Sequence, residues 1–412
     1  MGKISKTEIV MRAVFIVFTA LSIAFAGFMV QMSLAETRIS EYGVRFQEFP
    51  DYAHALIQGE TGITADKLDT RLYSDIIMYG NRLHFPFGPV PVALFLPFAL
   101  LPGDGFPTLA ITFLLLAATG ALAFRIAKSR GLTERDALWI AAAYSLGSAV
   151  APLAIPVANS WLVILIANVF LLLALDSHLT KRRVWLTGTF LALATATRPV
   201  SAIGILAYVL LTTRWRRETG SKSTTSRLPL PASRLIKLLL PLIFAVLLIG
   251  AYNHLRFGDF TESGYEIQWQ ADPVLRERMT HGSMDLRYLP DNLRYFLIEP
   301  PNLAGSFPFV LPDGMGMGII FGSPFMLYIL FRIKRWRKMI KPLAAAAIGL
   351  VPALTFYASG FSQIGYRYAV DVYPLLFLAL IAAFGDKVPR IAKALITISV
   401  IAHIIWMVAL FT

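Results

Sequence analysis

The chain has 412 residues, of which 56% are hydrophobic and only 15% are charged. Soluble domains carry about 25% charged residues, so this composition argues against a soluble enzyme and against a disordered or fibrous protein. The absence of cysteine excludes disulfides, thiolate catalysis and cysteine-ligated metals. In a chain embedded in lipid, the net charge of +13 indicates cytoplasmic loops rather than nucleic-acid binding.

Long apolar runs predict an all-α polytopic membrane protein, because about 20 helical residues cross the hydrocarbon core of a bilayer. We expect eleven spans, at residues 11–33, 106–124, 137–155, 161–178, 184–197, 199–213, 235–252, 315–331, 342–357, 368–385 and 391–411. The apolar segment 85–102 is not counted, because its five prolines remove backbone donors and disfavour helix. We interpret it as a juxtamembrane or re-entrant segment.

The distribution of charge supports this topology. With the N-terminus inside, the inner segments carry 26 basic and 6 acidic residues, which leaves 12 basic and 19 acidic residues outside. Basic residues concentrate on the cytoplasmic side of membrane proteins. A span at 85–102 would reverse every later loop and would place the clusters RIAKSRGLTER and RIKRWRKMIK outside, so eleven spans fit better.

Two long outer loops stand out in the single transmembrane domain that we expect over residues 1–412. The first, residues 34–105, includes the proline-rich segment, and the second covers residues 253–314. Both are rich in aromatic residues, which are scarce in disordered chains. Loops of this length are typically functional when they are ordered, so we expect the active site at the outer face.

The first loop contains the motif RFQEFPDYAHAL, with Asp51 directly after a proline. Its apolar positions fit a short amphipathic helix lying on the membrane. A carboxylate near the start of that helix can reach a sugar hydroxyl at the bilayer surface; the alternative is that Asp51 only stabilises the helix N-terminus. Glu48 is the competing carboxylate, and Tyr52 is a neighbouring candidate for substrate binding.

Three arginines at outer ends of spans are candidates for binding a phosphate. Arg198 breaks the charge rule beside Pro199 and is either an anion site or a residue that extends to the headgroups. Arg256 and Arg367 offer planar forks suited to phosphate, although Arg367 could instead pair with Asp371 four residues on. Further candidates for hydrogen bonds to substrate are His84, Asn253, Tyr265, Tyr366, Tyr368 and Asp371. No spacing of the six histidines suggests a metal site.

In their order along the chain these motifs resemble the polytopic glycosyltransferases of the GT-C fold. The closest likeness is to the branch of protein O-mannosyltransferases, aminoarabinose transferases and their bacterial relatives. The resemblance rests on FPDYAHAL, HFPFGPVPV, ATATRP at 194–199, YNHLRFGDFTESGY at 252–265 and GYRYAVDVYP at 365–374. It implies that Asp51 is the catalytic base. Many relatives carry a second Asp before the fourth span, where this chain has Asn159, so the resemblance does not support a two-carboxylate mechanism and Asn159 becomes a further candidate for substrate binding.

The resemblance implies transfer of a sugar from a polyprenyl-phosphate donor to a glycan, lipid or protein acceptor, with inversion and without a metal or cofactor. It also implies a location in a membrane such as the bacterial inner membrane, with the active site facing outward. A transporter or lipid flippase is the alternative. Such a protein needs polar residues along a path at mid-membrane depth, and the spans offer mainly Asn168. That scarcity favours an active site at the surface.

Overall fold

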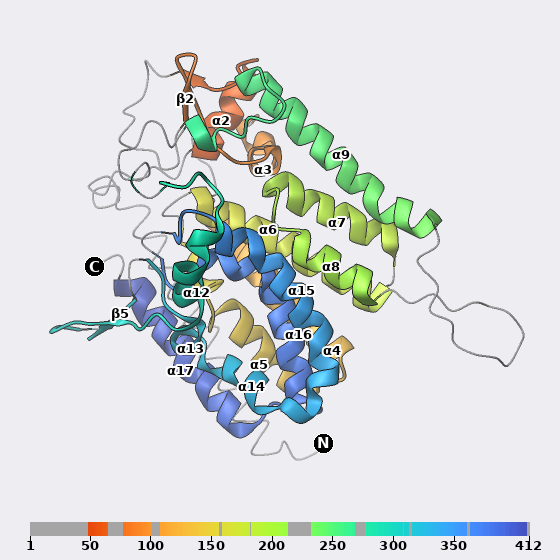
Figure 1. Ribbon diagram of the computed structural model, residues 1–412, viewed down its shortest axis with the longest axis vertical. Coiled ribbons are helices and arrows are strands. Elements are labelled where there is room, and N and C mark those ends of the chain that lie inside the picture. Colours follow the sequence, from red (N-terminus) through yellow and green to blue (C-terminus); the bar gives the residue numbers. More distant parts are fainter. Residues whose placement is uncertain are drawn as a thin grey trace, which may run out of the picture.

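The computed structural model describes residues 48–64, 77–100, 108–155, 159–181, 183–212, 232–267, 277, 279–307, 309–312, 315–360 and 363–409. The predicted span 11–33 lies outside these residues. Within them, six helical segments are long and apolar enough to cross a membrane. They correspond to α4 (Thr108–Ser129), α6 (Asn159–Asp176), α9 (Ala232–Phe257), α15 (Trp336–Thr355), α16 (Tyr373–Phe384) with the preceding 3₁₀ helix Arg367–Val372, and α17 (Arg390–Ala409). The chain is therefore a helical integral membrane protein (Figure 1).

At other predicted spans, the helices are shorter than these six or are interrupted. These spans contain α5 (Glu134–Ser145), α7 (Val184–Thr197) and α8 (Ile203–Thr212). The prediction of one helix over 315–331 is wrong, because that stretch is broken into α13 (Ile319–Gly322), a 3₁₀ helix at Pro324–Leu327 and α14 (Tyr328–Phe331). Pro324 follows Gly322 and Ser323, and such residues interrupt a helix whatever the hydropathy around them.

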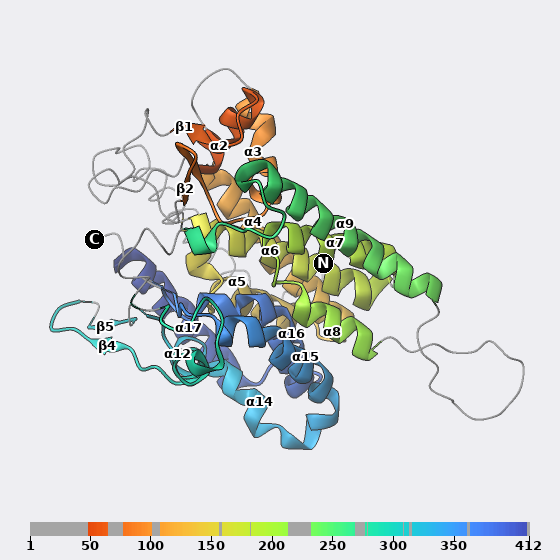
Figure 2. The same cartoon turned by 45° about the horizontal axis from the view of Figure 1, so that its top comes forward.

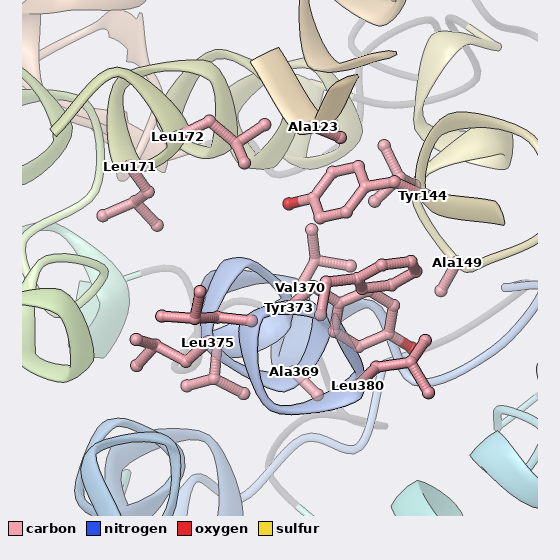
Figure 3. Packing of buried hydrophobic residues seen from close by; sticks show 14 of the residues in the cluster. Ala123, Tyr144, Ala149, Leu171, Leu172, Ala369, Val370, Tyr373, Leu375 and Leu380 are labelled. Atoms are coloured by element: carbon pink, nitrogen blue, oxygen red, sulfur yellow. The ribbon is translucent and has the colours of Figure 1, made fainter. Parts of the chain in front are cut away.

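The interior of the bundle is apolar, and the polar side chain of Asn168 within it is hydrogen-bonded to other buried groups. Side chains such as Tyr144, Leu172 and Val370 converge between α5, α6 and α16 (Figure 3). The Tyr144 hydroxyl donates to Asn168 Oδ1 at 2.9 Å, and Asn168 Nδ2 donates to the Val370 carbonyl at 3.0 Å. Asn168, the main mid-membrane polar residue, is therefore bound within the core.

The helices differ in how much of their surface faces lipid. The spans that contain α6 and α16 are 78% and 83% buried, whereas α9 is only 17% buried and packs mainly on α7. The contact between α7 and α9 is lined by small residues, because Ala192, Ala196 and Ala245 meet there and a Cβ at Gly188 would lie 2.5 Å from the Leu238 carbonyl oxygen. Close approach through small residues is typical of helix pairs in membranes.

A separate small core lies at one end of the bundle. It joins α2 (Glu48–Ile57), α3 (Pro89–Ala99) and a three-stranded antiparallel sheet of order β1-β3-β2, made of β1 (Ile63–Thr64), β2 (Ile77–Tyr79) and β3 (Arg82–His84). Phe49, Phe85 and Phe95 pack there against Leu162 and Ile166 of α6. The sheet was not predicted from the sequence.

The proline-rich segment forms a helix after all. Pro89 and Pro91 stand in the first turn of α3, where backbone N–H groups have no helical partner to lose. Pro97 alone lies in the helix interior. With 11 residues α3 is about 16 Å long, about half the thickness of a hydrocarbon core.

The second large loop adds α12 (Leu289–Leu297) and a hairpin of β4 (Asn302–Leu303) and β5 (Val310–Leu311). At the other end of the bundle, ion pairs link the helix ends: Arg125 with Asp176 at 2.8 Å and Lys393 with Asp136 at 2.6 Å. These four residues belong to segments that the sequence places inside. The polar loops that carry the candidate site residues and these inner pairs therefore occupy opposite ends of the helices.

Candidate functional site

The first cluster of candidate residues is a buried ion pair between Arg198 and Asp371. Arg198 ends α7 in an extended conformation (φ −148°, ψ 109°) because Pro199 follows it. Its Nη1 lies 2.7 Å from Asp371 Oδ2, and only 15% and 7% of the two side chains are exposed. Asp371 Oδ1 has no hydrogen-bond partner among the described residues. Asp371 is thus paired with Arg198, 173 positions away, rather than with the nearby Arg367.

Aromatic rings frame this pair. The guanidinium carbons of Arg198 and Arg367 each lie 5.2 Å from the centre of the Tyr368 ring, so Tyr368 holds two cations beside Asp371. The ring of Phe356 lies 5.8 Å from Tyr368 and 6.1 Å from Tyr265. These three aromatic residues are half-buried, so part of their surface stays accessible next to the cations.

Unlike the half-buried aromatic residues of this cluster, Tyr366 is fully buried. Its hydroxyl donates to the Ala353 carbonyl at 2.8 Å and its side chain is buried. Burial raises the pKa of Tyr366 far above its ordinary value, which keeps the hydroxyl protonated as a donor to that carbonyl. Tyr366 therefore anchors the segment that carries Arg367 to the end of α15.

Phe356 was missed by sequence reasoning. It follows α15 directly, and its backbone is fixed by the second loop, where Asp285 N donates to Thr355 O at 2.8 Å and Tyr357 N donates to Ser283 O at 3.1 Å. These pairs join segments about 70 residues apart, so no local pattern reveals them.

The second cluster surrounds Arg256 at the end of α9. Its Nη1 donates to the Phe85 carbonyl at 2.6 Å and its Nη2 donates to Asn253 Oδ1 at 2.7 Å, while the Tyr252 ring lies 4.0 Å from the guanidinium carbon. Arg256 is 6% exposed, and no carboxylate in the described part of the chain forms an ion pair with it. A buried cation without an anionic partner is costly, so this position favours an anionic ligand.

Tyr52 and His84 lie against Arg256. The Tyr52 hydroxyl donates to the Thr61 carbonyl at 2.6 Å and lies 3.1 Å from His84 Nδ1. Because the single phenol proton is used on Thr61, we infer that His84 Nδ1 carries a proton and donates to Tyr52, which leaves Nε2 as an acceptor in the neutral ring. Burial, together with the charges of Arg256 and Arg82, lowers the pKa of His84 to about 4, so the ring is neutral at physiological pH.

Asp51 stands on α2 beside this second cluster. The buried side chains of Phe49, Tyr52 and Ala53 fix α2 on the small core. Asp51 directly precedes Tyr52 in the sequence, and its side chain is half-buried. Glu48 and Asn159 begin α2 and α6, and their side chains lie outside the described part of the structure.

The short segment 85–88 joins the two clusters. Phe85 provides the carbonyl that binds Arg256, and Gly88 N donates to Thr197 O at 3.3 Å, next to Arg198. A Cβ at Gly88 would overlap the carbonyl oxygen of Ala196, so only glycine allows this approach. Figure 1 and Figure 2 show α2, α3 and the end of α9 together at the same side of the bundle.

These features define a membrane protein with a cationic, aromatic site at one end of its spans. The model of glycosyltransferase family 87 matches residues 85–225, which is about a third of the chain and includes α3, α7 and Arg198. No curated protein and no solved structure matches the chain. The family match supports a membrane glycosyltransferase with a donor and an acceptor substrate.

Proposed function

We propose that the protein is a GT-C-like enzyme that transfers a sugar from a polyprenyl-phosphate donor to an acceptor hydroxyl at the outer face of a membrane such as the bacterial inner membrane. The observation that carries the proposal is the buried Arg256 guanidinium, which has no carboxylate partner in the described chain and is linked through the segment 85–88 to the end of α7, next to the Arg198–Asp371 pair. Three arginines, Arg198, Arg256 and Arg367, belong to one end of an otherwise apolar bundle. A lipid monophosphate fits them, because its head is anionic and its tail is soluble in the bilayer around the helices.

In the proposed reaction Asp51 is the general base. Its carboxylate takes the proton of the acceptor hydroxyl, and the oxygen attacks the anomeric carbon of the donor sugar. The bond from that carbon to the phosphate oxygen breaks in the same displacement, which inverts the anomeric centre. The departing polyprenyl phosphate gains negative charge, and the guanidinium groups stabilise it.

The remaining candidate residues then bind the sugar and the phosphate. The half-buried rings of Tyr265, Phe356 and Tyr368 are suited to the apolar face of a sugar beside the cations. The neutral ring of His84 has one acceptor nitrogen for a substrate hydroxyl, and the side-chain oxygen of Asn253 accepts a hydrogen bond from the Arg256 guanidinium. Asp371 orients Arg198 through the 2.7 Å ion pair.

A transporter or flippase is less consistent with this geometry. Transport requires a polar path through the middle of the membrane. Asn168 instead bonds to Tyr144 and to the Val370 carbonyl inside the core, and the described charges occur at the two ends of the helices.

The experiment that tests the proposal uses the full-length protein in lipid vesicles, assayed for transfer against a panel of polyprenyl-phosphate sugars. With an active donor, Asp51→Asn should lower kcat by about 10²–10⁴-fold, as expected for the loss of a general base. The matched control is Asp291→Asn, which changes an exposed Asp in the first turn of α12. Transfer by Asp51→Asn at the rate of the control would refute the base assignment, and Glu48→Gln would then test the competing carboxylate.

A further inference from the structure

The second large loop presents apolar side chains outward on two elements. On α12, Leu289, Leu293 and Leu297 recur every fourth residue, and all three are exposed. On the β4–β5 hairpin, Leu303 is 86%, Phe307 70% and Phe309 58% exposed. In both views the hairpin extends beyond the helices of the bundle (Figure 1, Figure 2). In water, such an exposed apolar surface would be unfavourable.

The faces of α12 are arranged for three environments. At 100° per residue, the three leucines cover one stripe. The buried residues Asn292 and Phe296 lie on one side of that stripe and face the bundle. Asp291 lies roughly opposite the leucines on the same helical projection. The helix therefore has a protein-facing side, an apolar side and a polar side, as expected for a helix that lies in a membrane interface.

At the tip of the hairpin, the side chains of Phe307 and Phe309 are exposed although the backbone at Phe309 is strained. Phe309 has a φ of +63°, which is unfavourable for a bulky residue, and the turn is held by Phe309 N donating to Ser306 O at 2.7 Å and by Ala304 N donating to Phe309 O at 2.9 Å. The rings of Phe307 and Phe309 pack edge to face with centres 6.3 Å apart. No charged residue occurs between Glu299 and Asp313, so the tip is uncharged as well as apolar.

Three hydrogen bonds attach these elements to the ends of two candidate spans. Trp406 Nε1, near the end of α17, donates to the Val310 carbonyl in β5 at 2.7 Å. Asn292 Nδ2 of α12 donates to the carbonyls of Leu354 and Phe356, at the end of α15, at 3.1 and 2.7 Å. The candidate membrane spans in α15 and α17 end at Thr355 and Met407, close to these contacts. Both elements are thus attached at the ends of candidate spans, where a membrane–water interface is expected.

We propose that α12 and the β4–β5 hairpin dock into the lipid surface beside the bundle, at the end that carries the site. The leucine stripe of α12 and the Phe307–Phe309 tip enter the boundary between headgroups and acyl chains. This surface continues the lipid-facing side of α15, where Ile348 and Val351 are exposed. Because the tip carries no basic residue, its binding depends on apolar contact and not on anionic headgroups.

The cysteine-free sequence allows a direct test in the full-length protein. Phe307→Cys and Leu293→Cys are labelled with an environment-sensitive fluorophore and reconstituted in phosphatidylcholine vesicles, with His281→Cys, an exposed position in the same loop, as the matched control. Labels at 307 and 293 should be quenched by lipids brominated on the acyl chain. They should be quenched by aqueous iodide several-fold less than the label at 281.

The measurement reads no transfer activity, so its outcome is separate from that of the proposed reaction. Equal quenching by iodide at all three positions would overturn the proposal, because the loop would then lie in water. A label at 307 that neither quencher reaches would also overturn it, because the tip would then be covered by protein, such as a second copy of the chain. Adding anionic lipid to the vesicles should leave the pattern unchanged.

Discussion

Removing the Asp371 charge should destabilise the protein, because the Arg198 guanidinium would remain buried without a counter-charge. The two side chains meet at 2.7 Å and are mostly withdrawn from solvent. Breaking a buried pair by removing one partner typically costs about 3–5 kcal/mol, whereas replacing both by apolar residues is often close to neutral. We therefore expect Asp371→Asn to cost about 3–5 kcal/mol, and the double variant Arg198→Met with Asp371→Leu to recover most of that loss.

The assay is thermal unfolding of the purified full-length protein in detergent, followed by the loss of the monodisperse peak. For a chain of this size, a loss of 3–5 kcal/mol corresponds to a fall in the apparent melting temperature on the order of 5 °C. A double-mutant cycle compares four proteins: the parent, Arg198→Met, Asp371→Leu and the double variant. The cycle gives the coupling energy between the two side chains directly. Because Arg198 is proposed to bind the donor phosphate, the double variant should be folded and yet transfer sugar poorly.

Two results would refute the reasoning about the pair. If Asp371→Asn melts at the temperature of the parent, the Arg198 charge is not buried at a cost. If the double variant loses as much stability as the two single variants together, the side chains are not coupled. A double variant with full transfer activity would instead remove Arg198 from the phosphate site.

Three further predictions follow from the site geometry. Gly88→Ala should lower the apparent melting temperature by the equivalent of about 1–3 kcal/mol, because the added Cβ would overlap the Ala196 carbonyl. The control Gly305→Ala should leave the melting temperature unchanged, because there is open space around Gly305, and equal effects of the two substitutions would contradict the close approach at Gly88. Burial lowers the pKa of His84 from 6.5 to about 4, so the contribution of this residue to stability should be constant above pH 6.5 and fall by about 3 kcal/mol as the pH drops from 6.5 to 4; melting of His84→Gln should therefore depend less on pH than melting of the parent, and an equal pH dependence would contradict this contribution. In the transfer assay Phe356→Ala should raise KM about tenfold and Phe356→Trp should restore it, and an unchanged KM in Phe356→Ala would remove this ring from the sugar site.

The sequence was sufficient where the relevant signal is local. Hydropathy alone places apolar helices at 161–178, 235–252 and 391–411, close to the observed α6, α9 and α17. It failed at 315–331, where the glycines and Pro324 break the helix although the average hydropathy stays high. The proline-rich segment 85–102 was interpreted as a juxtamembrane or re-entrant segment and not as a full span, and it contains the 11-residue helix α3, with Pro89 and Pro91 in a first turn that tolerates proline.

The contacts within the site were not predictable in this way. Arg198, Arg256 and Asp371 were recognised as candidate site residues, but Arg198 pairs with Asp371 and Arg256 binds the Phe85 carbonyl, and each of these contacts joins positions more than 170 residues apart. The local spacing suggested Arg367 as the partner of Asp371, and tertiary packing selected Arg198 instead. The role of Phe356 depends on pairing with residues 283–285, which no periodicity indicates.

The segment 85–88 has a consequence for how variants of the site will combine. It binds Arg256 at its first residue and the end of α7, next to Arg198, at its last residue. A shift of α9 therefore changes the position of the α7 end through a backbone path of four residues. The effects of substitutions at Arg256 and at Arg198 on donor binding should for this reason be non-additive, although the two residues belong to different helices, and the two cationic clusters behave as one binding unit.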